Sequence, residues 1–475
     1  MWRNPLAGLV GRLLRERRGA VALLLAVAVV PLVGMVGLAT DAARGWIVRE
    51  KLAHALDAAG LAGGRAMLSP TRDADIAAFF AANFPAGFLG AQVTGPSIVA
   101  DLDTGELTLE AQAAVPTSFV RVLGIETVDV RARAVVRRAV RGMELVLVMD
   151  NTGSMRSNGK IDAMKGAATT LVNQLYGEHE TVDDFWVALV PYVASVNIGP
   201  GRTDWLATHN PALYLNSTWK GCVEARAAPY DQTDDPPAVA AFAPYRWAST
   251  SGQYNGNGDN NWTPTNMNEA NSAQDNGRGP NLGCGPPILP LTAEKSTVLA
   301  SIADMLPWHR GGTMANLGLV WGWRVLSPRW RGLWGGTSPA ELPLDYHTPL
   351  MDKVLIILTD GENQWFDWSG GQPNSPSADY TAYGRPTEGR LGVFNGGSAA
   401  TTIINNRMLA ACTAMKAEGV IIYAITFQLS STSAQNLYRS CATTPAHYFN
   451  SPSNSSLQNA FDAIGKDLTN LRLAS

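Results

Sequence analysis

Three kinds of hydrophobic pattern follow one another in the first part of the chain. Residues 19–39 form an apolar run without a single charged side chain, and residues 42–68 place Ala, Leu and Ile at helical spacings of three and four. Residues 69–142 contain stretches such as TVDVRARAVVRRAV, in which apolar and polar positions alternate as they do in half-buried strands. The pattern predicts a long N-terminal helix followed by a small module that contains β-strands.

From residue 143 onwards, strands and helices alternate. The runs ELVLVM and KVLIILT are apolar along most of their length and are each followed by an aspartate, which is typical of strands buried on both faces of a parallel sheet. The segments KIDAMKGAATTLVNQLYG, NNRMLAACTAMKAEG and NSSLQNAFDAIGKDLTNLR carry apolar residues at helical spacing. This alternation predicts an α/β fold with a doubly wound, mostly parallel sheet.

Two long stretches, at about residues 200–290 and 361–400, interrupt the alternation. They are longer than the usual loops of compact domains, so we interpret them as ordered functional insertions or as partly disordered segments. The sequence NGNGDNNW at 255–262 is a partial match to a calcium loop, with Asn266 where such a loop needs Glu. The tryptophans of the insertions predict either a sugar-stacking or protein-docking surface, or packing onto the domain; they are Trp205, Trp219, Trp247, Trp262, Trp365 and Trp368.

The N-terminal apolar run is long enough to cross a membrane. As a helix its residues would extend roughly 30 Å, the thickness of the hydrocarbon core of a bilayer. A signal peptide is the alternative, but its apolar region is usually shorter and a small-residue cleavage site should follow, whereas here the helical pattern continues. Arginines precede the run, so we expect a retained anchor with the N-terminus in the cytoplasm and everything after residue 41 outside.

Charge and composition exclude several classes of protein. The chain has 475 residues and a formal charge of -3, which gives no general electrostatic reason to expect nucleic acid. Its six histidines form no metal-type pair at helical spacing, which argues against a zinc enzyme. The four cysteines form no CxxC motif, and an even number in an exported domain predicts two disulfides. Among the three pairings, sequence order favours Cys222–Cys284 and Cys412–Cys441.

Oxygen-bearing side chains follow the two buried strands. Asp150 and Asp360 each come at the end of a strand, and doubly wound sheets bind ligands beyond the carboxyl ends of their strands. Thr152 and Ser154 lie in the turn after Asp150, and Thr313 lies between two glycines and a predicted helix. Each of these residues alone is more often a helix cap or a turn residue. Together, two carboxylates and three hydroxyls are the ligands that hard cations such as Mg²⁺ prefer.

The sequence Asp-Asn-Thr-Gly-Ser at 150–154, with Thr313 and Asp360, resembles the metal-ion-dependent adhesion site of the von Willebrand factor type A (VWA) domain. That family has Asp-x-Ser-x-Ser after its first strand, a later Thr, and an Asp after its fourth strand, so Thr152 departs from the pattern but keeps the hydroxyl. The resemblance covers residues 143–475 without the insertions and implies a Rossmann-like fold. It also implies a bound divalent cation, with Mg²⁺ favoured over Mn²⁺ or Ca²⁺, and a protein partner whose acidic residue completes the coordination.

The N-terminal segment has a resemblance of its own. GAVALLLAVAVVPLVGMVGLATDAARGW, followed by LDAAGLAGG, is similar to the start of TadE/TadG-type proteins of the Tad (tight adherence, Flp) pilus-assembly system. Those proteins have a Gly-initiated membrane helix, a Pro-Leu-x-Gly segment, an Asp just outside and an Ala-rich helix. Joined to a VWA domain, the segment implies a TadG-like, single-pass protein of the bacterial inner membrane. Its C-terminal domain would be periplasmic or exported, with partners among pilus-assembly or envelope components.

Two other functions compete with metal-dependent protein binding. A carbohydrate-binding or cell-wall-binding envelope protein would use the tryptophans of the insertions. A metal-dependent phosphatase-type hydrolase would need a second acid and a lysine that holds phosphate, and the sequence places neither Lys160 nor Lys353 at the site. We therefore expect no enzyme. The predicted segments are a cytoplasmic basic segment at 1–18, a transmembrane helix at 19–40, an extension helix at 41–68, the β-containing module at 69–142 and the VWA domain at 143–475.

Overall fold

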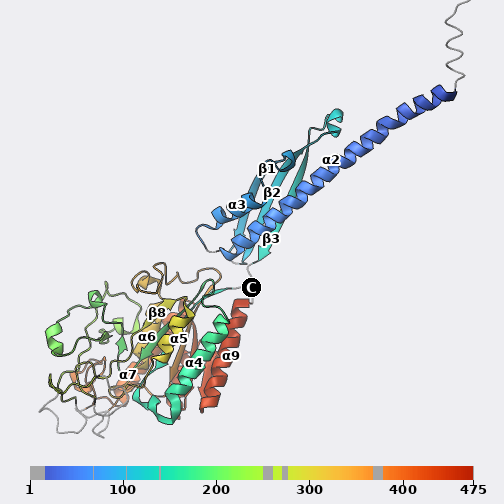
Figure 1. The fold of residues 1–475 in the computed structure, drawn as a ribbon. Helices are drawn as coiled ribbons and strands as arrows, with labels where there is room; N and C mark the ends of the chain where they lie inside the picture. Colours follow the sequence, from blue (N-terminus) through green and yellow to red (C-terminus); the bar gives the residue numbers. More distant parts are fainter. Residues whose placement is uncertain are drawn as a thin grey trace, which may run out of the picture. The chain divides into compact units, whose positions relative to one another are not determined.

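The structure is a computed structural model that describes residues 17–67, 69–102, 104–137, 141–249, 260–269, 277–366 and 378–473. The chain divides into two compact units, residues 1–139 and residues 140–474, which are described separately (Figure 1).

The N-terminal unit combines the long helix α2 with a three-stranded antiparallel sheet in the order β1-β2-β3. The C-terminal part of α2 lies along the sheet, and its N-terminal part extends beyond it (Figure 1). Close packing explains the small residues of this helix, because a Cβ on Gly60 would lie 2.7 Å from Val136 Cγ2. The elements are α2 (Arg17–Arg65), α3 (Arg72–Asn83), η1 (Phe88–Gly90), β1 (Gln92–Asp101), β2 (Glu106–Pro116), η2 (Val120–Leu123) and β3 (Thr127–Arg137).

The N-terminal part of α2 presents an apolar surface. Within the described part of the chain, one helix, Leu24–Arg65, is long and apolar enough to cross a membrane. Between Leu24 and Leu38 its large apolar side chains are 44% to 73% exposed, so this stretch is not the core helix of a soluble domain.

The C-terminal unit has a mixed α/β fold, the class that the alternating pattern predicts. Five parallel strands lie in the order β13-β12-β10-β4-β5, and β6, β7 and β8 add antiparallel pairs on the β5 side. The strands are β4 (Gly142–Asp150), β5 (Phe185–Tyr192), β6 (Val196–Asn197), β7 (Cys222–Val223), β8 (Leu289–Thr292), β10 (Met351–Thr359), β12 (Ile421–Phe427) and β13 (Tyr448–Ser451).

Helices cover both faces of this sheet. Alternate residues of β4 show the arrangement, since Leu145 and Leu147 enter one core while Val146 and Val148 enter the other. This two-sided burial explains why the strands are apolar without alternation. The first core includes α4 (Lys160–Tyr176), α5 (Lys295–Ala303) and α9 (Asn454–Leu473); the second includes α6 (Ala315–Leu326), α7 (Ser398–Ala417) and α8 (Thr432–Cys441).

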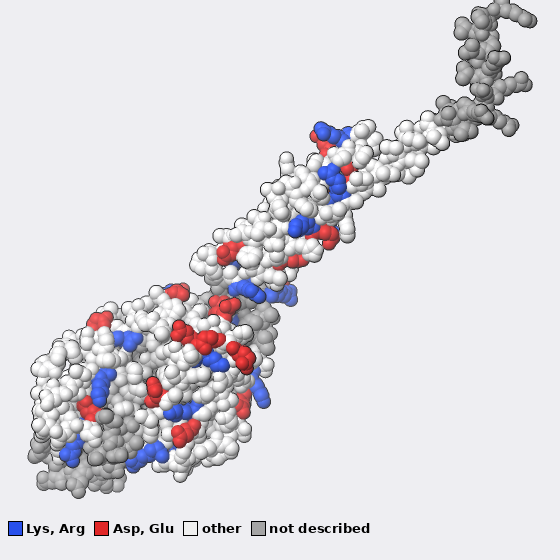
Figure 2. Space-filling view, in the orientation of Figure 1, with Lys and Arg blue, Asp and Glu red and all other residues white. Residues whose placement is uncertain are grey.

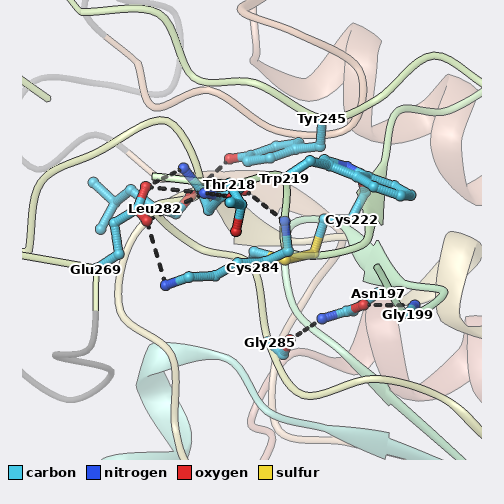
Figure 3. Close-up of a disulfide and its surroundings, with 12 residues drawn as sticks. Asn197, Gly199, Thr218, Trp219, Cys222, Tyr245, Glu269, Leu282, Cys284 and Gly285 are labelled. Carbon is cyan, nitrogen blue, oxygen red and sulfur yellow. Dashed lines mark hydrogen bonds and ion pairs between the residues drawn. A yellow bond between two sulfur atoms is a disulfide. The ribbon is translucent and has the colours of Figure 1, made fainter. Parts of the chain in front are cut away.

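The described parts of the two insertions are ordered and packed. Cys222 and Cys284 form a disulfide whose surroundings include Tyr245 and Trp247, and Trp219 Nε1 donates to the carbonyl of Cys222 at 2.6 Å (Figure 3). A second disulfide joins Cys412 and Cys441, so both pairings that sequence order favours are confirmed.

The tryptophans of the insertions are core residues. Five side chains are at most 4% exposed, and Trp205 packs edge-on against Trp330 with ring centroids 5.2 Å apart. The interpretation as an exposed stacking surface is therefore wrong for these five, because burial of the large indole rings leaves no face for a sugar; they are Trp205, Trp219, Trp247, Trp262 and Trp365. Trp368 and residues 255–259 of the partial match to a calcium loop lie outside the described residues.

Candidate metal centre

Asp150 and Asp360 meet at one edge of the sheet. The strands β4 and β10 are parallel neighbours, with Met149 opposite Leu358, so the two aspartates lie at adjacent strand ends. The chain places β5 on one side of β4 and the later parallel strands β10, β12 and β13 on the other, so the strand order reverses here. Such a reversal opens a crevice at the carboxyl ends of the strands, which is where open α/β sheets bind ligands.

The carboxylate of Asp150 is fully buried and surrounded by donors. Its Oδ1 accepts hydrogen bonds from the amide (2.8 Å) and hydroxyl (2.6 Å) of Thr152. Its Oδ2 accepts from Tyr192 Oη at 3.1 Å, Thr359 Oγ1 at 2.9 Å and the Asp360 amide at 3.4 Å. These bonds hold Asp150 in one orientation and leave it little freedom to move toward a ligand.

A continuous row of oxygens connects the two aspartates. Thr152 Oγ1 donates to Asp150, Ser154 Oγ donates to Asp360 Oδ1 at 2.6 Å, and the two hydroxyl oxygens are 3.0 Å apart. Each hydroxyl carries one proton and an ionised carboxylate carries none, so two protons serve three close contacts. The contact between Thr152 and Ser154 is then left with lone pairs on both sides, an arrangement that a cation would stabilise.

Thr313 comes to the same edge on a short strand. β9 (Gly312–Thr313) pairs antiparallel with β11 (Gln364–Trp365), which begins four residues after Asp360. Gly312 has φ 122°, and a Cβ there would lie 2.2 Å from the Gln364 carbonyl, so only glycine allows this approach. A Cβ on Gly361 would lie 3.3 Å from Thr313 Oγ1, which places this hydroxyl beside the Asp360 loop. Among the described residues, the Thr313 hydroxyl has no hydrogen-bond partner.

Lys160 is a member of the site that sequence reasoning left out. Its ammonium donates to Asp360 Oδ2 at 2.8 Å, and the residue is 9% exposed. The sequence does carry a signal, because Lys160 is the first residue of α4, where a positive charge opposes the helix dipole. Lys353 is placed elsewhere, as a buried partner of Glu144. Tyr192 and Thr359 are also new, and no motif in the sequence marks them.

The electrostatics of the site indicate a deficit of positive charge. Burial, and then the negative charge of Asp360, raise the pKa of Asp150 to about 6 from its ordinary value of 3.8. Lys160 donates to Asp360 and not to Asp150, so the carboxylate of Asp150 has only neutral hydrogen-bond donors. A further cation near the hydroxyl row would balance this charge.

A cavity of about 340 Å³ opens directly beside the hydroxyls. Thr152, Ser154 and Thr313 line it, and Ser154 is solvent-exposed. Its other walls include Arg156, His309, Arg310 and Phe366. Gly153 allows the His309 wall to approach, because a Cβ there would lie 3.0 Å from His309 Nδ1. A ligand in the cavity can therefore reach the hydroxyl row. The Arg310 guanidinium in its wall is already paired with Asp379, with Nε 2.7 Å from Oδ2.

The residues present fit a hard divalent cation. Two carboxylates and three hydroxyls supply oxygen ligands only, which suits Mg²⁺ better than softer metals. Within the described ranges there is no cluster of three or more His, Cys, Asp or Glu side chains that could hold a metal by acidic or nitrogen ligands alone. The arrangement therefore depends on its hydroxyls, and it leaves room for a ligand from outside the chain.

Comparison with known proteins gives one family match. Residues 19–66 match the family described as "Putative Flp pilus-assembly TadE/G-like". No curated protein matches the chain.

Among solved structures, the chain is similar to pilus and VWA-type proteins at low identity. The pilus adhesin SpaC from Lactobacillus rhamnosus GG is 12% identical with a TM-score of 0.35, over 80% of this chain and 34% of SpaC. The vWF domain of the type V pili tip protein Mfa5 from Porphyromonas gingivalis is 11% identical with a TM-score of 0.35, over 70% of this chain and 96% of that domain.

A third similar structure contains a metal. Proximal thread matrix protein 1 from the mussel byssus, with a zinc-occupied MIDAS motif, is 15% identical with a TM-score of 0.30, over 70% of this chain and 48% of that protein. This chain thus spans about a third of SpaC and about half of the byssus protein. TM-scores this low do not establish a shared fold.

Proposed function

We propose that the C-terminal unit is a VWA-type domain that captures a protein partner through a divalent cation, Mg²⁺ being favoured, in Tad/Flp pilus assembly or surface adhesion. Asp150, Thr152, Ser154, Thr313 and Asp360 would hold the cation, directly or through water. When bound, the cation supplies an electrophilic position that an acidic side chain of the partner can occupy. Function is therefore binding, and no catalytic step is involved.

The observation that carries this proposal is the row of oxygens between Asp150 and Asp360. Two hydroxyl protons serve its three contacts, and Thr313 adds a hydroxyl without a partner among the described residues. The row lies at the point where strand order reverses and faces a cavity of about 340 Å³. A hydroxyl row used only for helix capping would need no accessible cavity and no additional oxygen from Thr313.

Location is the second part of the proposal. The family match covers the apolar helix and its continuation, and the apolar side chains of that helix are exposed along Leu24–Leu38. We propose that α2 anchors the protein in the inner membrane of a bacterial envelope. The arginines before the helix favour a cytoplasmic N-terminus, which leaves both folded units outside the cytoplasm. Pilus-assembly or other envelope components are then the accessible partners.

The sharpest test removes the Thr313 hydroxyl. Thr313→Val keeps the shape of the side chain and breaks no hydrogen bond within the described residues, so thermal stability without cation should stay unchanged. The affinity for Mg²⁺ or Mn²⁺, measured by calorimetric titration of the purified full chain in detergent, should fall roughly tenfold or more, as it does when groups around a metal are lost. Ser157→Ala removes another hydroxyl from the cavity wall and serves as the matched control. Equal cation affinity in wild type and Thr313→Val would contradict the proposal.

The structure supplies one feature that a phosphatase-type site needs and lacks another. Lys160 does lie at the site, which supplies a cationic side chain. However, Asp150 is fully buried and accepts hydrogen bonds at both oxygens, so it is not presented as a nucleophile. Hydrolysis of p-nitrophenyl phosphate with added Mg²⁺ distinguishes the two functions. Turnover that disappears in Asp150→Asn would favour the enzyme, and we expect none above the buffer rate.

A further inference from the structure

The loop between β2 and β3 exposes an apolar tip. Around η2, the side chains of Val122 and Leu123 are 90% and 78% exposed, and those of Phe119 and Ile125 are each 49% exposed. Single exposed apolar residues are common on protein surfaces and need no explanation. Here four of them occur within seven positions, on one loop, and next to a helix that is itself apolar and exposed.

Hydrogen bonds hold the loop in place although its apolar side chains are exposed. The carboxylate of Asp41 on α2 accepts hydrogen bonds from three consecutive backbone N–H groups. The donors are Ser118 at 2.9 Å, Phe119 at 2.8 Å and Val120 at 2.9 Å. At the base of the loop, Thr117 Oγ1 donates to the Ile125 carbonyl at 2.5 Å. The loop is therefore fixed to α2, and its apolar side chains are held outward by the fold.

The attachment point lies at the outer end of the apolar helix. A Cβ on Gly37 would lie 2.5 Å from Phe119 Cβ, so only a glycine lets the loop reach the helix there. Arg44, about two turns further along α2, donates from Nη1 to Ser118 Oγ at 2.6 Å. Gly37 is three residues inside the predicted span of 19–40, which corresponds to about 5 Å at the rise of an α-helix.

We propose that this tip, formed by Phe119, Val122, Leu123 and Ile125, inserts into the outer interface of the lipid bilayer beside α2. The inference rests on the proposed anchoring of α2, and it adds a second membrane contact to it. A bilayer is favoured as occupant because the tip contacts α2 within the depth of its predicted span. The exposed Arg121 lies within the same loop and can extend its charged group to the lipid head groups.

Asp41 and Gly37 both hold the loop against α2, Asp41 by accepting its backbone hydrogen bonds and Gly37 by allowing its close approach. Surface charges appear on the N-terminal unit along its sheet and loops, whereas residues 24–40 of α2 contain no charged side chain (Figure 2). Two contacts with the membrane, helix and tip, restrain the tilt of the module relative to the bilayer.

The test labels single cysteines in the full chain. The four native cysteines are paired, so a thiol introduced as V122C or L123C is the only reactive one. Each variant carries a bimane fluorophore and is reconstituted into vesicles of phosphatidylethanolamine and phosphatidylglycerol. Doxyl-labelled acyl chains report lipid contact, and iodide reports water contact. V99C, near the C-terminal end of β1 and 65% exposed, is the aqueous control, and L25C, in the apolar run, is the membrane control.

The expected result is strong quenching by doxyl lipid at 122, 123 and 25, with iodide quenching several-fold weaker than at 99. Iodide access at 122 and 123 equal to that at 99, with position 25 protected, would overturn the tip insertion and leave the anchor intact. Protection from iodide without quenching by lipid would also overturn it, because a protein surface would then cover the tip. Iodide access at position 25 as well would overturn the anchor and the tip together.

Discussion

Lys160→Met should strengthen cation binding. In the structure, the Lys160 ammonium holds Asp360 Oδ2, and Ser154 holds the other oxygen of the same carboxylate. A cation that uses Asp360 must share it with the ammonium and is repelled by its charge. Methionine keeps an unbranched side chain of similar length in the same buried position and removes the charge.

The size of the effect follows from the 2.8 Å separation of the two charged atoms. Two unit charges at that distance attract by about 1.5 kcal/mol even with the dielectric constant of bulk water, and by about four times as much at an effective value of ~20. A difference of about 1.4 kcal/mol is a tenfold change in an equilibrium constant. The lower figure alone therefore predicts roughly tenfold tighter binding of Mg²⁺ or Mn²⁺ by Lys160→Met.

Calorimetric titration of the full chain in detergent measures this affinity. Lys160→Arg keeps the charge and should leave the affinity near that of the wild type. Lys165→Met is the matched control on the same helix, since Lys165 donates to the carbonyls of Ala303 and Met305. Because Asp360 loses its partner, Lys160→Met should also melt at lower temperature without cation and show the larger gain in melting temperature when cation is added.

The reasoning fails if Lys160→Met binds Mg²⁺ and Mn²⁺ with unchanged or weaker affinity while its circular dichroism spectrum stays that of the wild type. In that case Lys160 and Asp360 would form an ion pair that does not compete with a divalent cation, and the hydroxyls of Thr152 and Ser154 would need an explanation other than cation binding.

Three further predictions concern the stability of the C-terminal unit, followed by tryptophan fluorescence during urea unfolding. Lys353→Met should lower the free energy of unfolding by roughly 3–5 kcal/mol, because it leaves the buried carboxylate of Glu144 unpaired, and adding Glu144→Leu should restore much of the loss. Burial raises the pKa of Glu144, so protonation neutralises it as pH falls, and the penalty of Lys353→Met should be smaller in mildly acidic than in neutral buffer; an equal penalty would contradict this. Replacing Cys222 and Cys284 with serine should cost about 4 kcal/mol, since the bridge closes a separation of 62 residues, and an unchanged urea midpoint would refute the estimate. Gly166→Ala, at an exposed position of α4 with open space around it, should raise the free energy of unfolding by roughly 0.5–1 kcal/mol, and a loss would show an unrecognised contact.

Much of the fold could be predicted from local pattern alone. A strand that is buried on both faces is apolar along most of its length, so β4 and β10 stand out as nearly continuous apolar runs. Parallel strands end at the same edge, which is why Asp150 and Asp360 could be expected to meet before any coordinates were known. The apolar helix and the cysteine pairing follow from equally local features, namely length, charge and order along the chain.

The side-chain contacts of the site depend on the tertiary structure. Lys160 and Asp360 are 200 positions apart, and Asp41 is 77 to 79 positions from the amides that it accepts. Sequence alone also left the tryptophans undecided between a binding surface and a core, because an indole ring suits both until burial is known. A local pattern determines which face of a strand or helix is apolar. Which distant groups meet is decided by strand order and packing, since only the folded chain brings their atoms within hydrogen-bonding distance.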